Sequence, residues 1–221
     1  MTKHINPKFK IRKSELESAI NLSLSRNGDS EFVVPPTELR NVESISLMGK
    51  RDIEQLVRNI PLRGTDLFPY KNSCIDVYKI SPEAIKIGQS FVLEEKILDL
   101  CRLPSHFSDF SLTGIANVPP ALLYGRNEDD EYCCSIYIPP LLEIHDNRQV
   151  LIDGMHRSYL AKSAGSTMMY VVVRGADAEL PFDPQGWSAV SQMSERPEIK
   201  DRYVNLDISK FRDLSVVGID G

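Results

Sequence analysis

The segment from Val150 to Val173, VLIDGMHRSYLAKSAGSTMMYVVV, constrains the fold more than any other part of the chain. The apolar pattern over Gln149 to Asp153 predicts a strand, and Gly154 allows a tight turn after it. The spacing that follows predicts a helix that ends at Gly165, and Met168 to Val173 predicts a returning strand. We therefore expect an α/β (α+β) fold with this helix packed on a small mixed sheet.

The turn at Gly154 also predicts a site for an anion, and the pattern favours a phosphate. The first backbone amides of a helix have no acceptor inside the helix, and here they belong to Met155, His156 and Arg157. We expect the Arg157 guanidinium to bind phosphate oxygens, with the Ser158 hydroxyl as a further donor. For His156 two roles stay open, a hydrogen bond to a phosphate or packing beneath the helix.

Two readings also stay open for the acidic residue of this turn. Asp153 could hold Mg²⁺ or orient a substrate hydroxyl beside the phosphates, or it could cap the helix. For Arg157 the alternative to phosphate binding is a bridge to a surface carboxylate. Lys162, one turn further along the helix, is expected on a solvated face.

Composition limits the possible partners. The chain has 26 basic and 31 acidic residues among 221, which gives a net charge of -5 and argues against nucleic acid or an anionic membrane as a partner. Four cysteines show neither zinc-site nor CxxC spacing, and the longest apolar run is far shorter than a membrane span. We expect a cytoplasmic protein without a membrane partner. The oligomeric state is left open.

The rest of the chain shows weaker patterns. Further elements are predicted as helices over 14–27, 53–60 and 92–103, and as strands over 75–80, 132–138 and 141–144, the last two either one bent strand or two short ones. Residues 105–131 are expected to be a long loop, and 145–148 a hairpin turn. This divides the chain into a helical extension (1–72), a core (73–175) and a tail that packs on the core (176–221).

The motif Asp-Gly-Met-His-Arg at 153–157, before a helix ending Ala-Lys-Ser-Ala-Gly, resembles the ParB/sulfiredoxin superfamily. Its members place a Gly-x-[His/Arg]-Arg turn before such a helix and return through an apolar strand. The resemblance implies a nucleotide-binding core over residues 73–175. Sulfiredoxins have a cysteine where this chain has Met155. A thioether cannot become a nucleophile, so sulfiredoxin chemistry is not expected.

Within the superfamily, the motif is most similar to the Asp-Gly-His-His-Arg of free serine kinases. That resemblance implies a phosphotransferase that acts on a small hydroxyl-bearing molecule with ATP or ADP, or with CTP, and Mg²⁺. It implies catalytic roles for Asp153 and His156, with Glu83 as the base that activates the acceptor. The alternatives are a ParB-like module that senses a nucleotide without catalysis and, less favoured by the acidic charge, a nuclease. Whether the chain is an enzyme stays open.

Overall fold

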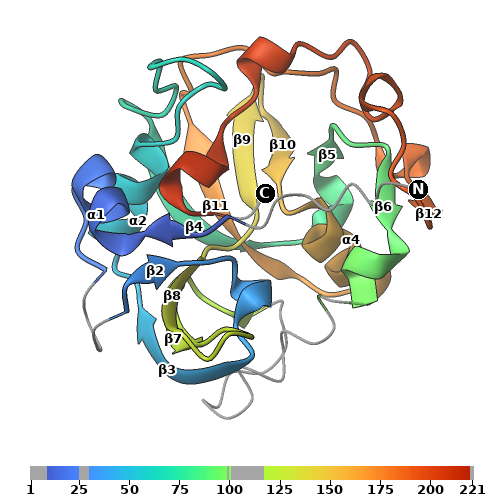
Figure 1. The fold of residues 1–221 in the computed structure, drawn as a ribbon. Coiled ribbons are helices and arrows are strands. Elements are labelled where there is room, and N and C mark those ends of the chain that lie inside the picture. The colour runs from blue at the N-terminus through green and yellow to red at the C-terminus, as the bar shows by residue number, and fades with distance from the viewer. Residues whose placement is uncertain (1–8, 25–29, 99, 101–116, 220–221) are drawn as a thin grey trace.

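The computed structural model describes residues 9–24, 30–98, 100 and 117–219, which form a mixed α+β fold (Figure 1). The strands are β1 (Ile11–Arg12), β2 (Phe32–Val33), β3 (Asn41–Leu47), β4 (Cys74–Ile80), β5 (Lys86–Ile87), β6 (Phe91–Leu93), β7 (Ala121–Arg126), β8 (Tyr132–Tyr137), β9 (Leu141–His145), β10 (Arg148–Asp153), β11 (Met168–Arg174) and β12 (Ser191–Met193). The α-helices include α1 (Lys13–Ile20), α2 (Lys50–Arg58) and α4 (Met155–Ser163). Short 3₁₀ helices include η2 (Pro82–Ala84) and η7 (Leu214–Val217). The α+β class predicted from the sequence is confirmed.

The strands form two five-stranded sheets and a two-stranded one. The first sheet has the order β1-β2-β8-β7-β3, in which only β2 and β8 are parallel. The second has the order β4-β11-β9-β10-β5, in which β11 is parallel to β9 and β10 is parallel to β5. β6 pairs in parallel with β12 beyond β5 (Figure 1). Both large sheets are therefore mixed.

The chain passes from the first sheet to the second between β8 and β9, at Ile138, Pro139 and Pro140. The apolar stretch over 132–144 is thus two strands in different sheets. Side chains on either side of this passage, including Ile136 and Leu141, belong to one buried core. This continuous core holds the two sheets together.

The motif helix α4 packs on the second sheet, as expected. Met155, Ser158 and Ala161 face inward at helical spacing, and Met155 and Ala161 join a buried cluster with side chains of β10 and β11. The two-residue turn between β9 and β10 places Asp146 and Asn147 at φ 48° and 62°, which fits a type I′ hairpin. Gly165 follows α4 at φ 62°. These local predictions are confirmed.

Three predictions in weaker regions need correction. The first helix ends at Ile20 rather than near residue 27, because Asn21 adopts a left-handed conformation. The helix predicted over 92–103 begins later, because residues 92 and 93 belong to β6. Within this range, the described helical residues are 94–98 and 100. The expected loop over 105–131 contains β7, while residues 105–116 lie outside the described part. β7 is buried on both faces, so its sequence lacks the polar alternation typical of a half-buried strand.

The N-terminal 72 residues are not only helical, because they also supply β1, β2 and β3 to the first sheet. The tail runs back across the molecule and places η7 against α1 (Figure 1). Among the described residues, no helix combines the length and the apolar composition that crossing a membrane requires.

Candidate functional site

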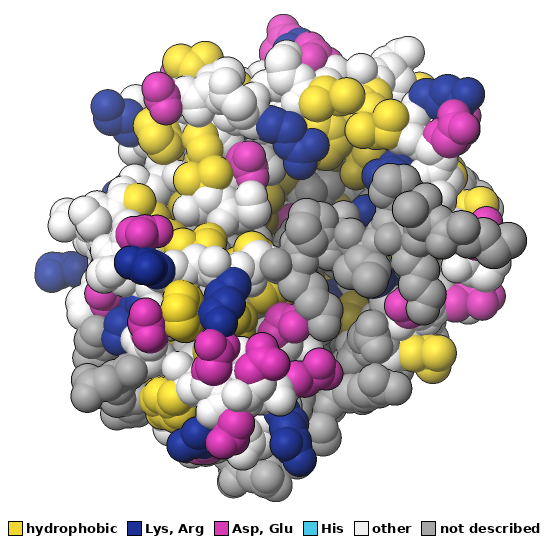
Figure 2. Space-filling view, in the orientation of Figure 1, with side chains coloured by type: hydrophobic (Ala, Val, Ile, Leu, Met, Phe, Trp, Pro, Cys, Tyr) yellow, Lys and Arg dark blue, Asp and Glu magenta, His cyan; other side chains and the backbone are white. Residues whose placement is uncertain are grey.

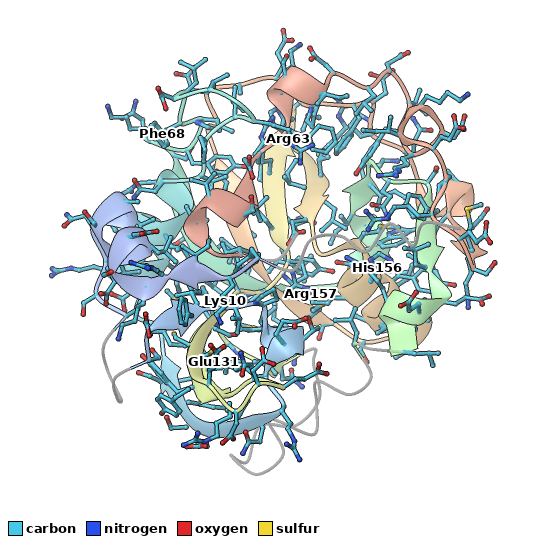
Figure 3. The ribbon with its side chains drawn as sticks, in the orientation of Figure 1. Lys10, Arg63, Phe68, Glu131, His156 and Arg157 are labelled. Carbon is cyan, nitrogen blue, oxygen red and sulfur yellow. The ribbon has the colours of Figure 1, made fainter. Side chains whose placement is uncertain are left out.

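A cavity of about 740 Å³ lies at the N-terminal end of α4. All five motif residues, from Asp153 to Arg157, line it. The opposite walls come from segments distant in the sequence, namely Arg63, the region around β6, and the tail. His156 and Arg157 lie close together at this end of α4 (Figure 3). The structure thus places the predicted motif at a cavity.

The turn itself is held tightly by its neighbours. Gly154 has φ 86°, and a Cβ added to it would lie 2.6 Å from the Cβ of Pro140. The first helical hydrogen bond of α4 runs from the Ser158 amide to the Gly154 carbonyl at 2.9 Å. The amides of residues 155–157 therefore precede the helical hydrogen-bond pattern, as an anion site at a helix N-terminus requires.

Arg157 is held by two strong contacts inside the protein. Its Nη2 donates to Oδ2 of Asp153 at 2.9 Å, and its Nη1 donates to the Ile138 carbonyl at 2.5 Å. The two side chains of this ion pair are 11% and 8% exposed. Arg157 thus lines the cavity, but Asp153 already balances its charge. This pairing weakens the prediction that Arg157 is the main phosphate ligand.

His156 is a neutral ring that accepts a hydrogen bond through Nε2. The Leu93 amide donates to its Nε2 at 2.9 Å, so the proton of the neutral ring lies on Nδ1. Burial, and then the positive charges of Lys96, Arg196 and Arg157, lower the pKa of His156 to about 4. The ring therefore stays uncharged at neutral pH, and it cannot act there as a cationic phosphate ligand.

This pKa predicts a measurable pH dependence of stability. The unfolded chain takes up a proton on His156 near pH 6.5, whereas the folded chain does so only near pH 4. The contribution of the neutral ring is therefore fully present above pH 6.5 and is lost as the pH falls towards 4. Between pH 7 and pH 5, we expect the free energy of unfolding of wild type to fall by about 1–2 kcal/mol more than that of His156→Gln. Urea unfolding at both pH values measures this, and an identical loss in the variant would contradict the assignment.

Two predicted site residues do not meet the others at the cavity. Glu83, in η2, is 65% exposed in its side chain and lies 3.4 Å from Lys162, which contacts it from α4. Ser158 is fully buried beneath α4. Neither residue is among those that line the cavity. The role of Glu83 as a base, which the resemblance to free serine kinases implies, therefore gains no geometric support.

Sequence reasoning missed the basic residues of the cavity, because they come from separate segments that share no motif. Arg63, Lys96, Arg196 and Arg202 all line it. In the part of the chain that the structure describes, Arg63, Lys96 and Arg202 form no ion pair with a carboxylate. Burial lowers the pKa of Arg202 and the charge of Arg196 lowers it further, as expected for two neighbouring cations. Figure 2 shows Lys and Arg side chains in dark blue and Asp and Glu side chains in magenta, both spread over the face that it draws.

Among the described residues, the acidic ones that line the cavity are Asp153 and Asp213. Over the described ranges, no group of three or more His, Cys, Asp or Glu side chains has the arrangement of a metal site. Mg²⁺ bound by one or two carboxylates together with phosphate oxygens needs no such group.

A mixed α+β core with a Gly-x-His-Arg turn in front of its sheet-packed helix agrees with the resemblance to ParB-like proteins seen in the sequence. The family model of the ParB CE domain matches residues 52–191, which is more than half of the chain and includes the whole motif. The chain belongs to this family. No curated protein and no solved structure matches it. Arg196, Arg202 and the rest of the tail lie beyond the matched residues.

Proposed function

We propose that the chain is a nucleotide-binding protein and that its cavity holds the nucleotide by its phosphates. One observation carries this proposal. In a chain of net charge -5, Arg63, Lys96 and Arg202 line the same cavity as the N-terminus of α4, and none of them pairs with a carboxylate among the described residues. Positive charge that the protein does not balance itself favours an anionic ligand, and a helix N-terminus adds directed amides.

The dimensions of the site support a small ligand. Cavities of about 300–1,000 Å³ are typical of small-molecule sites, and this one is about 740 Å³. The phosphates would contact Lys96, Arg202 and the first-turn amides of α4, with Nδ1 of His156 as a neutral donor. Arg157 would act mainly by holding the turn in shape through Asp153 and Ile138. A bound Mg²⁺ would neutralise phosphate charge, with Asp153 as its protein ligand.

The geometry favours nucleotide binding over any one transfer reaction. A kinase similar to the free serine kinases needs a carboxylate beside the acceptor hydroxyl. Glu83 lies outside the cavity, and Asp153 lies within it but is paired with Arg157. If phosphoryl transfer occurs, Asp153 is the better candidate for the base.

The binding proposal predicts a large effect of two substitutions. Titration calorimetry with ATP, ADP and CTP, each with Mg²⁺, identifies the preferred nucleotide for wild type. We expect Lys96→Ala and Arg202→Ala each to weaken its binding about 10-fold, and the double variant about 100-fold, since a hydrogen bond to a charged group is worth about 1.5–3 kcal/mol. Lys200→Ala is the matched control, because Lys200 is exposed, pairs with Glu198 and does not line the cavity. Unchanged affinity in the double variant would contradict the proposal.

Activity is tested separately from binding. Wild type is incubated with ATP or ADP, Mg²⁺ and a panel of amino acids and other small hydroxyl compounds, and phosphorylated products are sought. A phosphorylated product supports a phosphotransferase, and if Asp153 takes part in the transfer, Asp153→Asn should lower product formation more than it lowers nucleotide binding. Binding without product supports a nucleotide-sensing module. Cleavage of supercoiled plasmid in the presence of Mg²⁺ would instead support a nuclease.

A further inference from the structure

The tail contributes an aromatic wall to the cavity. The rings of Phe182 and Tyr203 are stacked, with centroids 5.3 Å apart and an interplanar angle of 15°. Phe211 packs edge-on against both, at 5.3 Å from Tyr203 and 6.4 Å from Phe182. All three residues line the cavity. Tyr203 and Phe211 lie beyond the residues that the ParB CE domain model matches.

This wall is anchored from several sides. Phe182 is buried against Gly88, where an added Cβ would lie 2.2 Å from the phenyl ring. The Arg63 guanidinium lies over the Phe211 ring, 5.3 Å from its centroid. Arg212, which follows Phe211 in the chain, forms a bidentate ion pair with the buried Glu143 of β9. The rings are therefore held in fixed positions before any ligand binds.

The wall also retains surface that a ligand can reach. Phe182 is buried and serves as a support, whereas Tyr203 and Phe211 are half-buried. Burial raises the pKa of Tyr203, Arg202 opposes this shift, and the charge of Asp153 adds to it. The Tyr203 hydroxyl thus lies within electrostatic reach of both the motif and the cavity cations. A molecule that spans the cavity would therefore contact both the groups proposed to bind phosphate and the aromatic rings.

Resting on the nucleotide-binding function proposed above, we infer that Tyr203 and Phe211, with Arg63 beside them, receive the base of the nucleotide. Aromatic rings and guanidinium groups stack on the faces of bases, and the interaction tolerates different bases. The cations and the α4 turn then take the phosphates. Specificity for a ring-bearing ligand would therefore come from the tail, outside the family-matched part of the chain.

The test compares two probes, ATP and inorganic tripolyphosphate, each with Mg²⁺ on the full chain. Both carry the phosphates, but only ATP carries a base. We expect wild type to bind ATP about 10-fold more tightly than tripolyphosphate, and Tyr203→Leu to lose that advantage while its affinity for tripolyphosphate is unchanged. Tyr203→Phe keeps the ring and should bind ATP as wild type does. Tyr78→Leu is the control, because Tyr78 is an exposed tyrosine of β4 outside the cavity.

The outcomes separate this inference from the function on which it rests. If wild type binds both probes equally, or if Tyr203→Leu weakens both equally, the assignment of the base is overturned and phosphate binding stands. If wild type binds neither probe, the proposed function itself is overturned. The thermal midpoint of each variant is measured to show that it is folded. Should Tyr203→Leu fail to fold, Phe211→Leu gives the same comparison.

Discussion

Replacing Arg212 with leucine is expected to lower the free energy of unfolding by about 3–5 kcal/mol, because it leaves a buried carboxylate without its cation. Nε of Arg212 donates to Oε1 of Glu143 at 2.7 Å, and Nη2 donates to Oε2 at 2.8 Å. Both side chains are fully buried. The Tyr70 hydroxyl also donates to Oε1, at 2.5 Å. This ion pair joins the tail to the middle of the second sheet.

Unfolding in guanidinium chloride measures this loss of unfolding free energy, and two further variants show whether it comes from the ion pair. The double variant Glu143→Leu/Arg212→Leu should recover much of the loss, since it removes both buried charges. Arg174→Leu is the control, because Arg174 is 46% exposed and lies 3.5 Å from Asp76, and exposed pairs contribute about 0–1 kcal/mol. A loss in Arg212→Leu no larger than that of the control would show that the pair is not important for stability.

The ion pair between Glu143 and Arg212 also makes the stability of the fold depend on pH in the acidic range. Burial by itself would raise the pKa of Glu143, but hydrogen bonds from His145, Tyr70 and Arg212, together with the charge of Arg212, hold it below the usual range. A carboxyl group with a lowered pKa contributes stability above the pKa of the unfolded chain and loses it as the pH falls through the folded value. Arg212→Leu should therefore reduce the acid sensitivity of unfolding below pH 4.5 as well.

Replacing Gly154 with alanine is expected to cost about 2–4 kcal/mol, because the new methyl group meets strain and a clash together. Its φ of 86° is unfavourable for any residue with a Cβ, and that Cβ would lie 2.6 Å from Pro140. To relieve the clash, the turn would have to move away from Pro140, in the segment that links β8 to β9. Binding of the proposed nucleotide should weaken along with stability, because the first-turn amides of α4 would shift.

Gly165→Ala provides a matched control for this effect. Gly165 also has a positive φ, 62°, but nothing lies within 4 Å of the position of its Cβ. Its replacement should cost only about 1–2 kcal/mol, from backbone strain alone. Thermal and urea unfolding of both variants measure the difference, which reports the contact with Pro140. Equal losses in the two variants would show that this contact does not restrain the motif.

The sequence predicts the motif region well, because strong local rules act there. The strand, the turn, α4 and β11 follow from hydrophobic spacing and from the positions of Gly154 and Gly165. The β9–β10 hairpin follows from Asp146 and Asn147, which tolerate positive φ. Each of these signals lies within a few residues of the structure that it specifies.

The rest of the site could not be predicted, since it depends on contacts between distant segments. Arg63, Lys96 and Arg202 carry no motif, and only the folded chain brings them to one cavity. The ion pair between Asp153 and Arg157 could not be predicted either. Their spacing of four residues does not show whether the carboxylate contacts a metal or the guanidinium. β7 was missed for a different reason, since burial on both faces removes its alternating pattern.

The sheet topology also bears on the order in which the chain can assemble during synthesis. β4 pairs with β11, nearly a hundred positions later in the chain, and β3 pairs with β7. β3 and β4 therefore pair with strands that are made much later, and long loops must close before the sheets form. Until β11 emerges, β4 exposes its edge, and the nascent chain depends on that late strand to cover it.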